Sequence, residues 1–347
     1  MVPITADDAL RRLLAEGRVR AAATDRAHLR LWDALAAATE GGKRFRPALV
    51  TATHKALGGT RPLAAVEVGA AVELLHTAFV IHDDVVDGDD VRRGRLNVSG
   101  TYKAGALAAG LAPDEALTMG RTAGILAGDL ALAAAVRAVA TCGAPADVVH
   151  RLLDLFDEAL HTTAAGELAD VRLSLGLGDP SVSESLTMEE QKTSAYSFAL
   201  PMRAGALLAG ADEAKVGRLG EAGRLLGIAF QLADDLLGVF GDPGRTGKSS
   251  TNDLHTSKRT PLLAHATSTA EWERIRALVG RDLTDDELTE VRRLLTVSGS
   301  RRFVEELADR HLTAARTIIE QLGVSTELLA AVPTGHPTLL AGKEVPA

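Results

Sequence analysis

Apolar residues recur at helical spacing along most of the chain, in segments separated by short stretches of Gly, Pro or Asp. Residues three or four apart in a helix share a face, so this periodicity predicts a succession of helices. The predicted helices cover residues 5–22, 25–39, 45–57, 62–88, 115–141, 146–173, 187–209, 213–240, 259–278, 284–296 and 301–322. Strand patterns are sparse, so we expect an all-α protein.

Some helix ends carry their own signals. Thr5 with Asp8, and more clearly Thr284 with Glu287, match the capping box, in which two side chains satisfy free backbone N–H groups. Pro201 should kink or interrupt its helix, because proline lacks an N–H group.

The connections are short, with one notable exception. The segment 241–252 is rich in turn residues and is expected to be mobile before a ligand binds. Roughly the last 25 residues are weakly patterned and are expected to fray. The sequence shows neither an internal repeat nor a low-complexity linker, so we interpret residues 1–347 as a single domain.

Composition supports a soluble helical protein. Of the 347 residues, 46% are apolar, 24% charged and only 3% aromatic. Cys142 is the single cysteine, which excludes an internal disulfide and fits a reducing compartment. We interpret its side chain as a small buried hydrophobe rather than a nucleophile.

The N-terminal segment, the apolar segments and the net charge further limit the possible location and partners of the protein. The charged N-terminal segment has no apolar core and does not resemble a signal peptide. The most apolar helix candidate, 121–142, is interrupted by Asp129 and Arg137, which favours a protein core over a membrane span. We therefore expect a cytoplasmic protein without a transmembrane segment. The net charge of −8 argues against nucleic-acid binding, although local basic clusters can still bind diphosphates.

Two aspartate clusters carry the candidate chemistry. The first, HDDVVDGDDVRRGR, runs from His82 to Arg95, and the second, QLADDLLGVFGD, runs from Gln231 to Asp242. In a helix the first cluster places several carboxylates on one stripe, where they repel one another. A divalent cation would relieve this repulsion, and oxygen-only ligands favour Mg²⁺. The alternative is a solvated acidic turn.

Several ordered motifs resemble one family. They are GGKRFRP at Gly41–Pro47, ELLHTAFVIHDD at Glu73–Asp84, the first aspartate cluster with its RRG, GILAGDL at Gly124–Leu130, QKT at Gln191–Thr193, and the second cluster followed by TGK and DLHTSKRTPL. From about Gly41 to about Leu263 the chain resembles the trans-isoprenyl diphosphate synthases, or polyprenyl synthetases. The resemblance implies a helical bundle of the isoprenoid-synthase type around a deep central cavity, with the two aspartate motifs on facing helices.

The resemblance also implies a site for an allylic diphosphate. Its metal ligands are Asp83, Asp84, Asp87, Asp234 and Asp235. Three Mg²⁺ ions per site would neutralise the diphosphate and the leading carboxylates. The residues assigned to catalysis are Asp83, Asp87, Arg92, Lys192, Thr193, Gln231, Asp234, Lys248 and Lys258. Among these, the cations would stabilise the leaving diphosphate, and the oxygen dipoles of Thr193 and Gln231 could lie near the developing carbocation.

A second anion site is implied for isopentenyl diphosphate, which does not ionise. The residues that resemble it are Lys43, Arg46, His76 and Arg93. The arginines suit bidentate phosphate binding, and the two glycines before Lys43 permit close backbone approach. Taken alone, GGKRFRP could equally be a basic helix start with Pro47 in the first turn.

Three further residues need separate interpretations. His82 is expected to orient a carboxylate rather than to bind metal. Asp129 is expected to be structural, either buried and hydrogen-bonded or lining the cavity. Gly238 replaces the third aspartate of the second motif. This replacement should leave the motif with fewer spare metal-binding carboxylates without removing activity. It also puts the metal roles of Asp235 and Asp242 in doubt.

Product length would be set by the floor of the cavity. In the family this floor lies about one turn before the first motif, where this chain has Ala78 and Phe79. The hypothesis is a short-chain product, geranylgeranyl diphosphate first and farnesyl diphosphate second. The resemblance also suggests a homodimer packed through apolar helices.

Two other functions compete with this one. A class I terpene cyclase also ionises an allylic diphosphate, and Asn252, Asp253 and Thr256 imitate its second metal motif. Thr260 stands where that motif requires Glu, and a cyclase has no use for an isopentenyl diphosphate site. A non-catalytic partner subunit is favoured only by Gly238.

Overall fold

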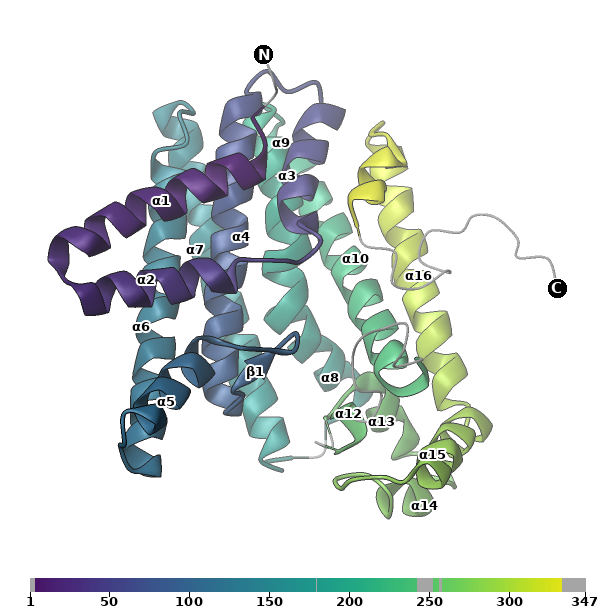
Figure 1. Ribbon diagram of the computed structural model, residues 1–347. Coiled ribbons are helices and arrows are strands. Elements are labelled where there is room, and N and C mark those ends of the chain that lie inside the picture. The colour runs from purple at the N-terminus through teal and green to yellow at the C-terminus, as the bar shows by residue number, and fades with distance from the viewer. Residues whose placement is uncertain (1–3, 179, 242–251, 256–257, 333–347) are drawn as a thin grey trace. The chain divides into compact units, whose positions relative to one another are not determined.

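The computed structural model describes residues 4–178, 180–241, 252–255 and 258–332 (Figure 1). The described part is mostly helical, which confirms the all-α prediction. The first half of the chain forms α1 (Ala6–Thr24), α2 (Arg26–Ala38), α3 (Phe45–Ala56), α4 (Pro62–Asp87), β1 (Val91–Arg92), β2 (Arg95–Leu96), α5 (Val98–Ala108), α6 (Pro113–Ala140) and α7 (Ala146–Ser174). The second half forms α8 (Val182–Glu189), η1 (Glu190–Ala199), α9 (Leu200–Leu208), α10 (Glu213–Phe240), α12 (Asn252–His255), α13 (Pro261–Ala266), α14 (Trp272–Arg276), α15 (Asp285–Val297), α16 (Ser300–Gln321) and η2 (Thr326–Ala331).

Contacts divide the chain into two compact units. Unit 1 is Met1–Phe156 with Ala204–Asp212, and unit 2 is Asp157–Arg203 with Glu213–Ala347. Helices α7 and α9 each continue from one unit into the other. Each unit carries one of the two aspartate clusters.

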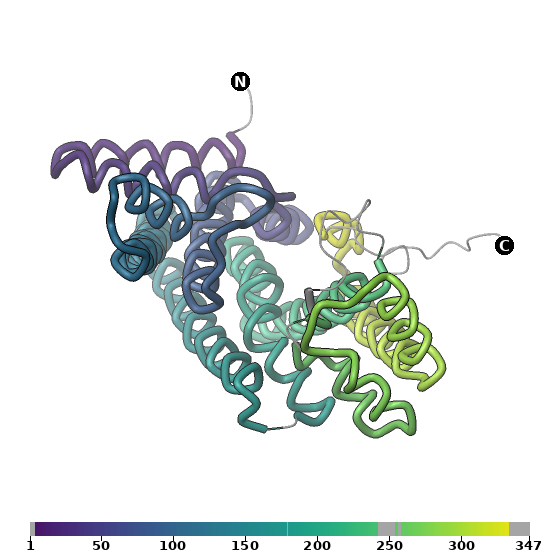
Figure 2. The backbone as a smooth tube through the Cα atoms, turned by 60° about the horizontal axis from the view of Figure 1, so that its bottom comes forward, coloured from purple at the N-terminus to yellow at the C-terminus, as the bar shows by residue number. Residues whose placement is uncertain are grey.

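Unit 1 is built around α4, most of whose residues are buried. α4 packs against α3 and α6, and the antiparallel pair α1 and α2 packs on α4 and α6 (Figure 2). Ala78 and Ile81 of α4 share a hydrophobic cluster with the large side chains of α2 and with the alanines Ala123, Ala127 and Ala131 of α6. These small residues let the backbones of α4 and α6 approach closely.

Unit 2 is built around α10, which runs antiparallel to α16 and also contacts η1 (Figure 1). Its core includes Leu232 and Leu236 of α10, Leu262 of α13, Leu294 of α15 and Val304 of α16. The same helix, α10, therefore buries one face in this core and presents the second aspartate cluster on another.

Most of the predicted helices are present, with two breaks. The predicted helix 187–209 becomes α8, a π-helical segment η1 and α9, and the return to α-helix begins one residue before Pro201. The predicted helix 259–278 is wrong, since it consists of α13 and α14. The hydroxyls of Thr267, Ser268 and Thr269 donate to carbonyls three residues back and so end α13.

Among the longer helices of the described residues, one was not predicted, and both predicted capping boxes were correct. α5 was not predicted, because its small residues and glycines give little periodicity. Asn97 caps it by accepting a hydrogen bond from the N–H of Gly100 at 2.8 Å. Both expected capping boxes, at Thr5 and at Thr284, are formed.

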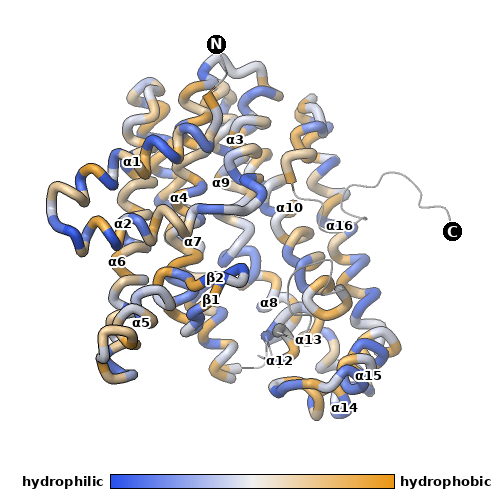
Figure 3. Tube along the Cα trace, in the orientation of Figure 1, coloured by the Kyte–Doolittle hydropathy of each residue, from blue (hydrophilic) through white to orange (hydrophobic). Residues whose placement is uncertain are grey.

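Among the described residues, two helices, α4 and α6, are long and apolar enough to cross a membrane by length and composition (Figure 3). In the most apolar window of α4, 78% of the residues are buried within the protein, and in that of α6 the share is 50%. The burial of α4 is that of a core helix. The expected cytoplasmic location stays a prediction.

Candidate active site

The first aspartate cluster lies at the C-terminal end of α4 in unit 1. Asp84 is buried, Asp83 is partly exposed and Asp87 is exposed. Gly88 then ends the helix in the left-handed conformation that glycine adopts easily, and the chain turns into the β1–β2 hairpin. The three aspartates therefore differ in how well a ligand from solvent can reach them.

The β1–β2 hairpin places Arg92 beside this cluster. The Nε of Arg92 donates to Oδ1 of Asp84 at 2.6 Å, and its NH2 donates to Oδ2 of Asp83 at 3.1 Å. Burial raises the pKa of Asp84 to about 6, although the neighbouring Arg92 acts in the opposite direction. Arg92 thus compensates a carboxylate that would be costly to bury alone.

The donor chemistry of this cluster fits Mg²⁺. Asp83 and Asp87 offer accessible carboxylate oxygens, and Mg²⁺ in proteins commonly takes one or two carboxylates, with water and phosphate oxygens completing its shell. Within the part of the chain that the structure describes, no group of three or more His, Cys, Asp or Glu side chains forms a preassembled metal cage.

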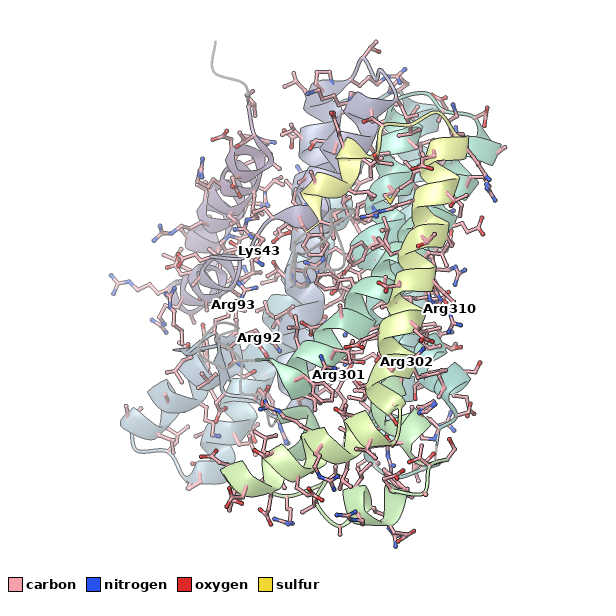
Figure 4. All side chains as sticks on the ribbon, turned by 90° about the vertical axis from the view of Figure 1, so that its right-hand side faces the viewer. Lys43, Arg92, Arg93, Arg301, Arg302 and Arg310 are labelled. Atoms are coloured by element: carbon pink, nitrogen blue, oxygen red, sulfur yellow. The ribbon has the colours of Figure 1, made fainter. Side chains whose placement is uncertain are left out.

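Two of the residues predicted to bind isopentenyl diphosphate, His76 and Arg93, lie beside this cluster in unit 1. Arg93 is held in the left-handed region at φ 53°, and its guanidinium lies against Gly41 and Gly42. A Cβ atom at either glycine would approach that guanidinium to 3.4–3.5 Å, and both glycines have positive φ. Figure 4 shows Lys43 together with Arg92 and Arg93 in this unit. The glycines thus allow the loop that carries Lys43 to pass close to Arg93.

The basic residues of GGKRFRP divide into two roles. The guanidinium of Arg44 donates to Asp7, to Glu73 at 2.6 Å and to the carbonyl of Thr39, so it links α1, α2 and α4. Lys43 is exposed, and Arg46 stacks over the ring of Phe45 at 4.4 Å. The motif therefore contains one structural arginine beside two basic side chains that stay accessible.

His76 lies among these basic side chains without carrying a charge of its own. Burial, and then the charges of Arg46 and Arg93, hold the pKa of His76 well below its ordinary range. The imidazole is therefore neutral near pH 7 and can donate one N–H to an anion. A cavity of about 250 Å³ in unit 1 is lined by His76, Arg92, Arg93 and Asp84, among others. Anion-binding groups and the first aspartate cluster thus share one cavity.

The second aspartate cluster lies on α10 in unit 2. Asp234 is partly exposed, whereas Asp235 is 1% exposed. Gln231, one turn before Asp234, is also partly exposed. Lys258 lies next to Asp235, with its Nζ 3.8 Å from Oδ1. Of the two aspartates, Asp234 is the one that a solvated metal can reach.

Lys192 is presented by the π-helical segment η1. Its Nζ is 2.6 Å from Oδ2 of Asp170 and 3.1 Å from Oε2 of Glu167, both on α7. Gly166 makes this approach possible, because a Cβ there would lie 2.2 Å from the backbone nitrogen of Lys192. Thr193 follows on the same segment and is partly exposed. π-Helical turns are frequent at functional sites, and here one carries two of the predicted catalytic residues.

His82 and Asp129 differ from expectation. The Nε2 of His82 lies 3.5 Å from Oδ1 of Asp129 and 3.4 Å from the carbonyl oxygen of Ile125, so the ring is directed at α6. Gly128 leaves room for it, since a Cβ there would meet the ring at 2.1 Å. The carboxylate beside His82 thus belongs to Asp129 on α6. Of the two alternatives for Asp129, the buried one is wrong, because its side chain is 62% exposed.

The two predicted floor residues have different surroundings. Ala78 is fully buried in the cluster shared with α2 and α6. Phe79, the next residue, is partly exposed. Ala78 is therefore committed to the core of unit 1, and a larger side chain there would disturb packing.

Some predicted positions lie outside the described residues. These are Lys248, Asp242, Thr256 and the side chains of Asn252 and Asp253. Conversely, no sequence pattern pointed to Glu167 and Asp170, which pair with Lys192, or to the buried Glu189. Acidic residues at helical spacing usually mark a solvated face, and only the tertiary contacts distinguish these from such a face.

The fold and these two clusters define a class of helical enzymes that bind diphosphates through carboxylate-held metal and basic side chains. Comparison with known proteins identifies the family. The model of the family described as "Polyprenyl synthetase" matches residues 30–295, so the chain belongs to the polyprenyl synthetase family. It is a trans-isoprenyl diphosphate synthase family enzyme, as its motifs indicated.

Relatives that are named for different products are equally similar in sequence to this chain. The chain is 34% identical over 286 residues to a geranylfarnesyl diphosphate synthase of Aeropyrum pernix, covering 81% of this chain and 84% of that protein. It is also 34% identical over 309 residues to a geranylgeranyl diphosphate synthase of Mycobacterium tuberculosis, covering 87% and 82%. A farnesyl diphosphate synthase of the same organism is again 34% identical, covering 82% and 75%. Overall identity therefore does not select a product.

A solved structure matches the whole fold. The geranylgeranyl pyrophosphate synthase from Corynebacterium glutamicum, complexed with isoprenyl diphosphate and magnesium, superimposes with a TM-score of 0.85 at 29% identity, covering 94% of each chain. The fold is thus that of the prenyl synthases.

Proposed function

We propose that the protein condenses isopentenyl diphosphate head-to-tail with allylic diphosphates, in a Mg²⁺-dependent reaction that yields an all-trans short-chain prenyl diphosphate. The observation that carries this proposal is the cavity of unit 1, where Asp84 and Arg92 of the metal cluster adjoin His76 and Arg93 of an anion site. A cyclase ionises one diphosphate and therefore needs only the metal cluster, not the second anion site. Two adjoining anion sites fit a condensation of two diphosphates.

The residues would divide the work as follows. Mg²⁺, at three ions per site in this proposal, neutralises the diphosphate that leaves the allylic carbon. Asp83 and Asp87 of unit 1 and Asp234 of unit 2 supply the accessible carboxylates that hold it. Cationic donors fixed in advance stabilise the leaving group without reorganising. These donors are Arg92, Lys192 and Lys258.

The second substrate would be held without metal. Lys43, Arg46, His76 and Arg93 bind the diphosphate of isopentenyl diphosphate, with the arginines as bidentate donors and His76 as a neutral N–H donor. Oxygen atoms of Thr193 and Gln231 face the developing carbocation. The released diphosphate accepts the proton that ends the condensation, because it is a stronger base than the neutral side chains assigned here.

For product length we propose geranylgeranyl diphosphate, with farnesyl diphosphate as the second choice. Phe79 is the residue that limits growth in this proposal, since Ala78 is packed in the core. Replacing Phe79 by Ala should lengthen the product, because it removes bulk one turn before Asp83. The variant Ala78→Phe is a poor probe of length at this site, because it would overpack a fully buried position.

The test is a product assay. The purified protein is incubated with Mg²⁺, isopentenyl diphosphate and, separately, the C5, C10 and C15 allylic diphosphates, and products are identified by mass. We expect a ladder that ends at C20 for the wild type and beyond C20 for Phe79→Ala. An end at C15 would favour farnesyl diphosphate. Cyclised hydrocarbon would support a cyclase, and absence of product with every primer would make a partner-subunit role the better explanation.

We also propose a homodimer that forms through α6. Met119, Ile125, Leu126 and Val136 of this helix are 39–48% exposed in the single chain. Large apolar side chains gathered along one helix are typical of an interface between subunits.

A further inference from the structure

Two arginines of the unit 1 cavity have an unusual backbone conformation. Among the described residues other than glycine, only Arg44 and Arg93 have positive φ, at 51° and 53°. Both line the cavity of about 250 Å³. A residue with a Cβ atom crowds its own backbone in this left-handed region, so the conformation persists only where other contacts hold it. Such residues gather at functional sites, so the contacts that hold them bear on the chemistry of the cavity.

Local structure accounts for Arg93 but not for Arg44. Arg93 and Gly94 are the two central residues of the β1–β2 hairpin, and a two-residue turn of this type requires positive φ at both. Arg44 is the residue before α3, where a serine or aspartate in an extended conformation would ordinarily cap the helix. Its side chain makes no capping hydrogen bond. The conformation of Arg44 therefore depends on its tertiary contacts.

The guanidinium of Arg44 is held by three acceptors. Its Nε donates to Oδ1 of Asp7 at 2.9 Å, its NH1 donates to Oε1 of Glu73 at 2.6 Å, and its NH2 donates to the carbonyl of Thr39. The side chain of Asp7 is 49% exposed, whereas that of Glu73 is 6% exposed. An ion pair exposed to water contributes little, and a pair with a buried carboxylate is screened much less. Glu73 is therefore the carboxylate that most restrains Arg44.

Glu73 is a costly residue for the position that it occupies. It lies on α4 between Val72 and Leu74, both fully buried, and it lines the cavity. Its second oxygen, Oε2, is buried and receives no hydrogen bond from the described residues. An apolar side chain would pack α4 equally well, because the cost of taking a carboxylate out of water often exceeds what its ion pair returns. The pair with Arg44 therefore indicates a role beyond packing.

The conformation of Arg44 also sets where two basic side chains lie relative to each other. Lys43 precedes Arg44 in the chain, and Arg46 follows it in the first turn of α3. A change of φ at Arg44 from positive to negative would turn the loop that carries Lys43 onto a different course, while α3 keeps Arg46 in place. The backbone of Arg44 thus determines the direction from which Lys43 can reach an anion.

We propose that Glu73 is a positioning residue for the diphosphate group of isopentenyl diphosphate. Its carboxylate holds the guanidinium of Arg44, the held guanidinium keeps the backbone of Arg44 left-handed, and this backbone presents Lys43 to the anion. Glu73 acts through Arg44 and does not touch the substrate. This inference rests on the proposed function, because it gives Lys43 the role of a diphosphate donor.

The experiment measures binding of isopentenyl diphosphate to the full-length protein by calorimetry, without an allylic diphosphate, so that no condensation occurs. Glu73→Leu removes the acceptor for Arg44 and should weaken binding about tenfold, whereas Glu73→Gln keeps an oxygen acceptor and should stay within about threefold of wild type. In steady-state assays Glu73→Leu should raise the KM for isopentenyl diphosphate and leave kcat and the KM for the allylic diphosphate nearly unchanged.

Substitution of Arg44 tests the backbone step directly. Arg44→Ala and Arg44→Gly are each combined with Glu73→Gln, so that neither leaves a buried charge unpaired. The alanine variant loses the side chain that holds the left-handed conformation and should bind isopentenyl diphosphate about tenfold more weakly than wild type. The glycine variant loses the same contacts, but glycine adopts positive φ without steric cost, so its binding should stay within about threefold of wild type.

The matched control is Glu67→Leu. Glu67 also lies on α4 and pairs with Arg12 of α1, but it is not among the residues that line the cavity, so binding should be unchanged. Equal binding by the alanine and glycine variants, or a Glu67→Leu variant as weak as Glu73→Leu, would overturn the positioning role. If thermal melting shows that Glu73→Leu is unfolded, the comparison of the alanine and glycine variants decides alone. A wild-type protein that does not bind isopentenyl diphosphate would instead contradict the proposed function, so the two failures are distinguishable.

Discussion

At the scale of residues, the aspartates of one motif do different work. Arg92 binds Asp84 at 2.6 Å, and Asp84 is buried, so this carboxylate anchors the hairpin. Asp83 and Asp87 stay accessible. The same division occurs in unit 2, where Asp235 is buried and Asp234 is accessible. In each pair of adjacent aspartates, one side chain belongs to the protein core and the other can reach a metal.

The two substrate sites should respond differently to mutation. Asp83→Ala removes a metal ligand and should lower kcat by at least about two orders of magnitude, because charge stabilisation in the transition state is lost. Lys43→Ala should instead raise the KM for isopentenyl diphosphate about tenfold and change kcat little. Steady-state kinetics with each substrate varied in turn would measure both. Indistinguishable kinetic profiles for the two variants would contradict the assignment of separate sites.

At the scale of elements, glycines decide where helices touch. Gly166 of α7 and Gly227 of α10 both face η1, and a Cβ at Gly227 would meet the Cβ of Ser194 at 2.4 Å. Without these contacts η1 could not approach both helices, and Lys192 would not reach Asp170. In unit 1, Gly17 of α1 has the same function for the indole of Trp32 in α2.

The α1–α2 contact yields a stability prediction. A Cβ at Gly17 would lie 1.7 Å from the Trp32 ring, whose Nε1 donates to the carbonyl of Leu14 at 2.7 Å. Gly17→Ala should therefore lower the free energy of unfolding by about 1–3 kcal/mol, because the packed ring must move. Thermal and denaturant unfolding would measure the change.

The control is another glycine inside a helix. Among the described residues, a Cβ at Gly217 of α10 would meet no neighbouring side chain within 4 Å. Gly217→Ala should therefore stabilise the protein by up to about 1 kcal/mol through helix propensity. Equal effects of the two substitutions would show that packing against Trp32 is not what requires Gly17.

At the scale of the whole molecule, the two units each bring a different part of the chemistry. Unit 1 contains the first aspartate cluster and the residues proposed to bind isopentenyl diphosphate, and unit 2 contains Asp234 with Lys192 and Lys258. α7 and α9 run through both units without a linker.

The proposed dimer is testable at this scale. Leu126→Glu places a charge on the exposed apolar face of α6 and should shift the protein from dimer to monomer in sedimentation velocity, because burying an unpaired charge is costly. Leu63→Glu, at a position 60% exposed at the start of α4, is the control and should leave the dimer intact. A wild-type protein that sediments as a monomer would contradict the proposal.

The sequence by itself determined the helical class and most helix boundaries, and it predicted where the chemistry lies. Helical periodicity is local, so α10 and α16 could be read to within a residue or so of their ends. Each motif is likewise a short stretch of sequence, so roles for Asp83, Lys43 and Arg93 could be predicted before the fold was known. Such patterns did not predict α5, whose periodicity is weak, or the π-helical turns of η1.

Only the tertiary structure decided how individual side chains are used. Sequence spacing treats Asp83 and Asp84, or Asp234 and Asp235, as equivalent, but burial and the approach of Arg92 or Lys258 distinguish them. The sequence gives no reason to expect that Glu189 is buried, yet in the folded protein its side chain is buried. The physical reason is that desolvation and charge pairing depend on neighbours distant in the chain, whereas helix formation depends mainly on neighbours within a few residues.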